Sequence, residues 1–216
     1  PLHARRHAPR DVQQRQAAVD RRLPAQGRQA AGGDLSRRAI MSRSAMTADF
    51  TEQDIAFMRR ALVLAHEGEL KGEVPVGAVL VRDGKIMGEG FNAPISRHDP
   101  TAHAEVLALR EAALGVANYR LDDTTLYVTL EPCTMCVGAL VHARVSRVVF
   151  AASEPKAGSL VSARRQLDSG YYNHVFRFQG GLLADEAGTM LSDFFRRRRA
   201  QKASASDESQ RGIIDE

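Results

Sequence analysis

The sequence predicts an α/β domain with a mixed central sheet covered by helices on both faces. Apolar, β-branched runs typical of strands alternate along the chain with amphipathic helical segments. The expected order is α-β-β-α-β-α-β, followed by a short strand and a helix, and such strand–helix–strand alternation favours a layered α/β domain. A length of 216 residues fits one domain with tails.

The first expected helix begins shortly after Met46. Thr51 and Asp54 form a capping-box pattern at its start. Strands are expected at 74–81 ("VPVGAVLV") and 85–92 ("KIMGEGFN"), because both runs are apolar or alternating and flank "RDGK", an Asp-Gly hairpin turn. A helix over 102–114 follows, with an apolar face that includes Val106 and Leu109.

The second half continues the alternation of strands and helices. The expected elements are a strand at 124–130, a helix at 134–143, strands at 146–152 and 174–180, and a closing helix at 183–199. The closing helix has one apolar face, formed by Leu183, Ala187, Met190, Leu191 and Phe194, which should anchor it to the sheet. No internal repeat is present.

Both ends of the chain differ in composition from this domain. Residues 1–45 are rich in Arg, Gln, Ala and Gly with few large apolar residues, which predicts a disordered basic extension. An over-extended start is the favoured interpretation, and an RNA-binding arm or a transit peptide is the alternative. Residues 46–199 are expected to form the folded domain, and residues 200–216 a polar disordered tail.

The whole sequence has a net charge of +4, but its central domain is acidic. Residues 1–45 carry a charge of +7 and residues 196–216 a charge of +2, which leaves −5 for residues 46–195. Binding of a nucleic acid therefore has to rely on local clusters, of which Arg196 to Arg199 is the largest. The alternative for this cluster is a solvated helix end that interacts with its own dipole.

Composition also limits the location of the protein. The sequence has no run of about 18 apolar residues, so no membrane contact is expected, and it shows no secretory signal. Two cysteines cannot form a disulfide framework. These observations predict a cytoplasmic protein.

Two short motifs place metal-binding side chains at expected helix starts. In "EPCTMC", Cys133 and Cys136 share one face of a first helical turn, and Pro132 suits a helix start. In "TAHAE", His103 and Glu105 stand at the start of the preceding helix. One His and two Cys make three ligands, and an open three-ligand site is typical of catalytic rather than structural zinc. Glu105 would then be free to transfer protons.

Each motif has a plainer interpretation on its own. A lone CxxC can be a redox pair, and a lone HxE is commonly surface decoration. Redox chemistry gives no role to His103 and Glu105, however, and both motifs stand where an expected helix begins. Their combination therefore favours zinc, with one Zn²⁺ per chain.

HAE followed by PCxxC resembles the signature of the zinc nucleobase deaminases, a group that hydrolyses the amino groups of nucleobases. The chain is most similar to the bacterial tRNA-specific adenosine deaminases, a resemblance that extends from about Asp54 to Arg199. It rests on "EVPVGAVLV", "GEGFNAPI", "RHDPTAHAE", "NYRLDDTTLYVTLEPCTMC", "SRVVF", "NHVF", "LLADE" and "SDFFR". The resemblance implies the cytidine-deaminase-like three-layer α/β/α fold, a homodimer, and deamination of the wobble adenosine of a tRNA anticodon loop to inosine.

The same resemblance implies roles for particular residues. His103, Cys133 and Cys136 would hold zinc, and Glu105 would donate and accept protons. Substrate contacts would come from Asn92, Ala104, Pro132 and His174, and further RNA contacts from Arg196, Arg197, Arg198 and Arg199. One departure is that the chain passes directly from Gly158 to Ser159, where family members carry a longer Gly/Ala loop.

Two alternative functions remain compatible with the zinc motifs. A guanine or small-nucleoside deaminase would share "DPTAHAE" and the two cysteines, but "SDFFRRRR" and "FNAPI" favour tRNA. A zinc-dependent RNA-binding module without catalysis would have no need for an acid such as Glu105 beside an open metal position.

Overall fold

The computed structural model describes residues 50–211, so the extension expected over 1–45 lies outside the described residues. Five strands form one sheet in the order β2-β1-β3-β4-β5. Strand β1 pairs antiparallel with β2 and with β3, whereas β3, β4 and β5 are parallel. The expected mixed sheet is therefore confirmed. The strands are β1 (Gly77–Arg82), β2 (Lys85–Phe91), β3 (Thr125–Leu130), β4 (Arg147–Ala152) and β5 (Arg177–Gly180).

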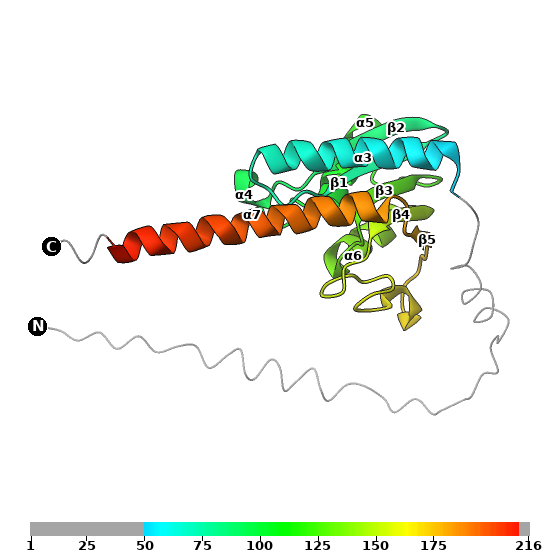
Figure 1. Cartoon of the computed structure of the whole chain (residues 1–216). Coiled ribbons are helices and arrows are strands. Elements are labelled where there is room, and N and C mark those ends of the chain that lie inside the picture. The colour runs from blue at the N-terminus through cyan, green and yellow to red at the C-terminus, as the bar shows by residue number, and fades with distance from the viewer. Residues whose placement is uncertain (1–49, 212–216) are drawn as a thin grey trace, which may run out of the picture. The chain divides into compact units, whose positions relative to one another are not determined.

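Helices cover both faces of this sheet, as expected. The helices are α3 (Glu52–Leu70), α4 (Pro94–Arg97), α5 (Ala104–Gly115), α6 (Thr134–Ala143) and α7 (Ala184–Arg211), with a 3₁₀ turn η1 (Gln166–Ser169). Helices α5 and α6 pack on the face that includes Leu80 and Val128, while α3 and α7 pack on the face that includes Val79 and Val149. Figure 1 shows α3 and α7 side by side on one side of the sheet.

Local signals in the sequence fix several element boundaries. Thr51 Oγ1 accepts a hydrogen bond from the Asp54 N–H (3.1 Å), and Asp54 Oδ2 accepts one from the Thr51 N–H (2.9 Å), so the capping box starts α3 as expected. Asp83 and Gly84 both have positive φ, and Arg82 pairs with Lys85 across them, which confirms the tight hairpin turn between β1 and β2.

The structure corrects the boundaries of β1, β5 and α7. Strand β1 begins at Gly77 and not at Val74, because Pro75 has no N–H and the Val76 N–H turns back to the Val74 carbonyl (2.8 Å). Strand β5 begins at Arg177, so His174 precedes it. Helix α7 continues to Arg211. The disordered tail predicted for 200–216 is therefore wrong over 200–211, where alanine, glutamine and lysine favour helix.

Two short elements, α4 and η1, were not expected from the sequence. Each has four residues, which is too short to show a helical period. Among the described residues, none of the helices combines the length and the apolar character of a membrane span.

The connections at one edge of the sheet bring the predicted site residues together. Asn92 follows β2, and Cys133 follows β3, whose carboxyl end lies at that same edge because β2 and β3 both run antiparallel to β1. Gly90 allows the start of α5 to lie directly against β2, since a Cβ there would stand 2.5 Å from the Ala104 carbonyl oxygen.

Candidate active site

Two helix starts meet at this edge of the sheet. His103 is the N-cap residue of α5 and Cys133 is the N-cap residue of α6, both in extended conformation. His103 therefore stands outside the helix, whereas Glu105 is the second residue within it. Two residues that are two positions apart within a helix would point to opposite sides of it. Because His103 lies outside the helix, its side chain can reach the same point as that of Glu105.

The ligand atoms of His103, Cys133 and Cys136 form a compact triangle. His103 Nδ1 lies 3.7 Å from Cys133 Sγ and 3.5 Å from Cys136 Sγ, and the two sulfurs are 3.7 Å apart. Tetrahedral zinc with bonds of about 2.3 Å to sulfur and about 2.0 Å to nitrogen requires separations of about 3.8 Å between sulfurs and about 3.5 Å between nitrogen and sulfur. The three side chains thus fit one zinc ion, and among the described residues no fourth ligand joins them.

The thiols interact strongly with each other and with the histidine. The hydrogen bond with Cys136 lowers the pKa of the Cys133 thiol, and the neighbouring His103 lowers it further. The same hydrogen bond and burial raise the pKa of Cys136, so that the two thiols share the remaining proton. A thiolate in this triangle is the form that a metal requires, and the α6 N-terminus favours it.

Glu105 places a buried carboxyl group beside the triangle. Its exposed fraction is 4%, and burial raises its pKa although His103 and its own backbone N–H act in the opposite direction. The side chain also interacts with Cys136. A buried carboxyl group with a raised pKa holds a proton more readily than an exposed one, which suits a general acid–base.

The structure brings Asn92, Ala104 and Pro132 to the same place. Asn92 Oδ1 accepts a hydrogen bond from the Ala104 N–H (2.9 Å), at the first turn of α5. Ala104 is fully buried, and Pro132 is buried directly before Cys133. These three residues therefore lie beside the candidate ligands His103 and Cys133, and their contacts with a substrate stay predictions.

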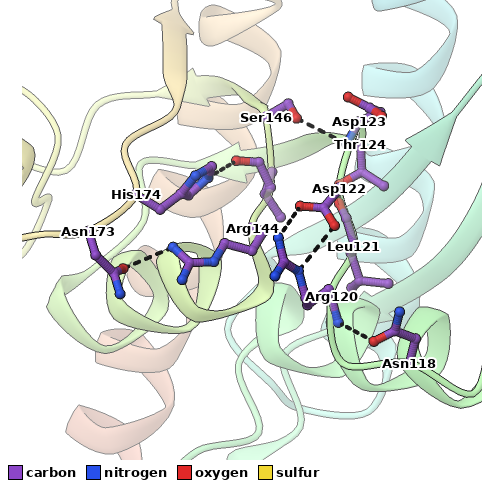
Figure 2. A network of polar contacts seen from close by, with 11 residues as sticks. Asn118, Arg120, Leu121, Asp122, Asp123, Thr124, Arg144, Ser146, Asn173 and His174 are labelled. Carbon is purple, nitrogen blue, oxygen red and sulfur yellow. Dashed lines mark hydrogen bonds and ion pairs between the residues drawn. The ribbon is translucent and has the colours of Figure 1, made fainter.

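His174 lies elsewhere. Its Nε2 atom is 2.7 Å from the Val145 carbonyl oxygen, just before β4 begins, and the neighbouring Asn173 accepts a hydrogen bond from Arg144 (2.9 Å; Figure 2). The zinc triangle follows the carboxyl end of β3, which is parallel to β4, so about 20 Å of strand separates the two places. The structure does not bring His174 to the triangle. The sequence motif "NHVF" supports the turn after α6 instead.

The four consecutive arginines of α7 differ in their surroundings. Arg196 and Arg197 form ion pairs, and Arg198 reaches a backbone carbonyl, whereas Arg199 has no partner among residues 50–211. The partners are Asp193 for Arg196 (2.7 Å), Glu69 of α3 for Arg197, and the Gly72 carbonyl for Arg198 (3.5 Å). The charges of Arg198 and Arg199 are therefore the ones left for an external anion.

Sequence reasoning missed two buried carboxylates that border the site. Glu73 is 1% exposed and accepts hydrogen bonds from the N–H groups of Ile95 (3.3 Å) and Ser96 (2.7 Å) at the start of α4. Glu131 is 3% exposed and stands between β3 and the first cysteine. For Glu131 the available signal was an acidic residue directly after an apolar strand, since buried charges are rare unless they have partners.

Comparison with known proteins agrees with this geometry. The family model for the cytidine and deoxycytidylate deaminase zinc-binding region matches residues 51–152. A tRNA-specific adenosine deaminase of Haemophilus influenzae is 51% identical over 153 residues, which are 70% of this chain and 88% of that protein. The tRNA-specific adenosine deaminase of Bacillus subtilis is 44% identical, over 71% of this chain and 95% of its own length.

A solved structure is also similar over nearly its whole length. It comes from studies of A-to-I editing by tRNA:A34 deaminases at the wobble position of transfer RNA, and it matches with a TM-score of 0.62 and 39% identity. The match covers 63% of this chain and 99% of that one. Together with the zinc triangle and Glu105, these similarities show that the chain belongs to the tRNA-specific adenosine deaminases, within the cytidine and deoxycytidylate deaminase superfamily.

Proposed function

We propose that the chain hydrolyses adenosine to inosine at the wobble position of tRNA anticodon loops. The observation that carries this proposal is the three-ligand triangle of His103, Cys133 and Cys136 with the buried Glu105 beside it. A zinc site with three protein ligands keeps one position open for chemistry. The choice of adenosine in tRNA is supported by the relatives, which are tRNA-specific adenosine deaminases at up to 51% identity.

The side chains around the triangle account for the proton transfers of this reaction. When bound, zinc supplies Lewis acidity at its open position, which makes water a nucleophile near neutral pH. Hydrolysis joins the water oxygen to C6 of adenine and breaks the bond from C6 to the exocyclic nitrogen, which leaves as ammonia. The Glu105 carboxylate accepts a proton from the water and delivers it to the ring nitrogen N1, then carries the second proton to the departing amine.

We propose that Asn92 orients the base. Its Oδ1 atom is occupied by the Ala104 N–H, so its amide orientation is fixed. The Nδ2 group makes no hydrogen bond with the described residues and can donate to an acceptor on the base. Burial of Ala104 and Pro132 excludes water from the sides of this position.

The assembly and location of the protein are part of the proposal. The family resemblance supports a homodimer, and sedimentation at several concentrations tests it, since a monomer at all concentrations would contradict it. A tRNA substrate supports a cytoplasmic location.

The decisive experiment offers three substrates to the zinc-loaded protein. An anticodon stem-loop, free guanine and free cytidine are incubated separately, and the products are read by mass spectrometry. We expect inosine in the stem-loop alone. Deaminated guanine or cytidine without inosine would indicate a small-molecule deaminase, and stem-loop binding without any product would indicate a non-catalytic module.

A further inference from the structure

Glu131 is a buried carboxylate that the proposed chemistry does not use. It follows β3 directly and stands two residues before Cys133, with an exposed fraction of 3%. Its carboxylate collects hydrogen bonds from a separate stretch of chain, residues 154–162, which we name the 154–162 segment. The donors are the N–H groups of Leu160 (3.0 Å), Val161 (2.8 Å) and Ser162 (3.0 Å) to Oε1, and the Glu154 N–H (3.2 Å) and the Ser162 hydroxyl to Oε2.

The three donors to Oε1 form a binding site for an anion. Consecutive backbone N–H groups that converge on one point make a concave nest with partial positive charge. In this chain the anion in the nest is the carboxylate of Glu131. The fit is close, because a Cβ at Gly158 would stand 2.5 Å from Glu131 Oε2 and 2.6 Å from the Glu154 carbonyl oxygen.

The 154–162 segment also touches the turn that carries the cysteine ligands. Gly158 pairs with Cys133 as an isolated β-bridge, and the Ser159 N–H donates to the Pro132 carbonyl (2.9 Å). The hydroxyl groups of Ser159 and Thr134 are 2.9 Å apart. The segment is therefore a wall beside the zinc triangle, and Glu131 is the only buried carboxylate of the described residues that holds it there.

Two apolar side chains in this region are partly exposed. Val161 is 38% exposed, and Met135, which lies between the two cysteines, is 37% exposed. Exposed apolar side chains next to a catalytic centre offer contact area to a base or ribose of the substrate. A displaced segment would change this contact area without changing the zinc ligands.

We infer that Glu131 is a positioning residue that holds the 154–162 segment as the substrate-facing wall of the zinc site. The inference rests on the proposed function for the identity of the substrate. The anchoring of the segment itself is independent of that identity, and it can be measured without any activity assay.

Substitution Glu131→Gln tests the inference with little change of shape. The amide oxygen still accepts from Leu160, Val161 and Ser162, but without charge, and the NH₂ group faces the Glu154 N–H donor to donor. We expect faster hydrogen exchange of the backbone N–H groups in the 154–162 segment. We also expect KM for the stem-loop to rise about tenfold, the equivalent of about 1.4 kcal/mol, while kcat stays within about threefold and zinc stays near one per chain.

Two further variants separate positioning from general stability. Ser162→Ala removes one donor to Glu131 and leaves the carboxylate in place, so it should raise KM in the same direction by about threefold. It keeps the inference testable if Glu131→Gln does not fold. Asp54→Asn is the matched control, because Asp54 is also a carboxylate with 3% exposure but contacts Tyr127 and Arg147. It should lower the unfolding temperature without changing KM or exchange in the segment.

Each outcome bears on the inference. Unchanged exchange in the segment of Glu131→Gln would overturn the anchoring role, and faster exchange with unchanged KM would overturn the role as a substrate-facing wall. Loss of zinc from Glu131→Gln would show that the residue holds the cysteine turn instead. If the wild-type protein bound zinc but did not deaminate the stem-loop, the proposed function would fail while the exchange measurement still decided the anchoring.

Discussion

His103, Cys133 and Cys136 are the proposed zinc ligands. Their ligand atoms lie within 4.8 Å of one another, and no other described His, Cys, Asp or Glu completes the group. With three ligands the affinity for zinc depends on each of them, because two protein ligands hold the ion poorly.

Cys136→Ala should therefore lose zinc. We expect about one zinc per chain in the wild-type protein and a substoichiometric content in the variant after dialysis, measured by atomic absorption. Met135→Ala is the matched control, since Met135 lies in the same helical turn but its thioether is not a usual zinc ligand, and the variant should keep its zinc. Stoichiometric zinc in Cys136→Ala would disprove the ligand set.

A substitution of Glu105 should lower the activity without the loss of zinc that is expected from a ligand substitution. Glu105→Gln keeps the size of the side chain and removes the proton acceptor, so zinc and fold should remain while kcat falls by about a thousandfold or more. Single-turnover deamination of the stem-loop measures this loss. Glu186→Gln changes an exposed carboxylate on α7 and should leave kcat unchanged. Near wild-type turnover in Glu105→Gln would remove this residue from the mechanism.

Helix α7 is joined to α3 by two ion pairs and also contains the four consecutive arginines. Glu186, near the start of α7, pairs with Arg59 of α3 (3.8 Å), and Arg197, further along α7, pairs with Glu69 near the end of α3. The two helices therefore run in the same direction. Because Arg196 and Arg197 are engaged within the chain, only part of the arginine cluster is left for a phosphate group.

The double variant Arg198→Gln and Arg199→Gln should weaken the salt dependence of stem-loop binding. Each lost phosphate contact reduces the log–log slope by about 0.7 on single-stranded RNA, so the pair should reduce it by about 1.4. KM should rise while single-turnover kcat stays near the wild-type value. Arg196→Gln is the control, because its partner is Asp193, and it should leave the slope unchanged. An equal slope in the double variant would place the RNA elsewhere.

At the scale of single elements, the sequence predicts what depends on neighbouring residues. The capping box at Thr51, the turn at Asp83 and the two helix starts at His103 and Cys133 are local patterns, and the structure has all four. Helix α4 could not be predicted, because the acceptor for its first N–H groups is the distant Glu73. The role of Glu131 could not be predicted for the same reason, because its partners lie about 30 residues away in the sequence.

The whole molecule is tied together by a buried polar cluster around Asp54 of α3. Asp54 Oδ1 accepts hydrogen bonds from Tyr127 of β3 (2.7 Å) and Arg147 of β4 (2.6 Å), and Arg147 also donates to Gln179 of β5 (2.7 Å). Burial alone would raise the pKa of Asp54. The hydrogen bonds from Arg147, Thr51 and Tyr127 outweigh burial and lower the pKa from 3.8 to about 2.

This shift predicts a loss of stability in acid. The pKa of the folded state lies below that of the unfolded chain, so the stabilisation is complete above about pH 5 and is lost as the pH falls through about 2. Its size is about 2 kcal/mol of unfolding free energy. Urea unfolding of the wild type and of Asp54→Asn should show a difference that shrinks by this amount between about pH 5 and about pH 2.

Loss of zinc in acid affects both proteins of this comparison alike, so it cancels in the difference. A constant difference over the pH range would contradict the low pKa of Asp54.

The strand order dictates when during folding the zinc site can exist. His103 comes before β3 in the chain and the two cysteines come after it, and β3 lies in the interior of the sheet between β1 and β4. The ligands therefore meet only once the segments before and after β3 have come together in the tertiary structure. We expect zinc binding to follow the folding of the sheet rather than to nucleate it, in contrast to a zinc finger, where metal and fold form together. The metal-free chain should accordingly fold before it takes up zinc.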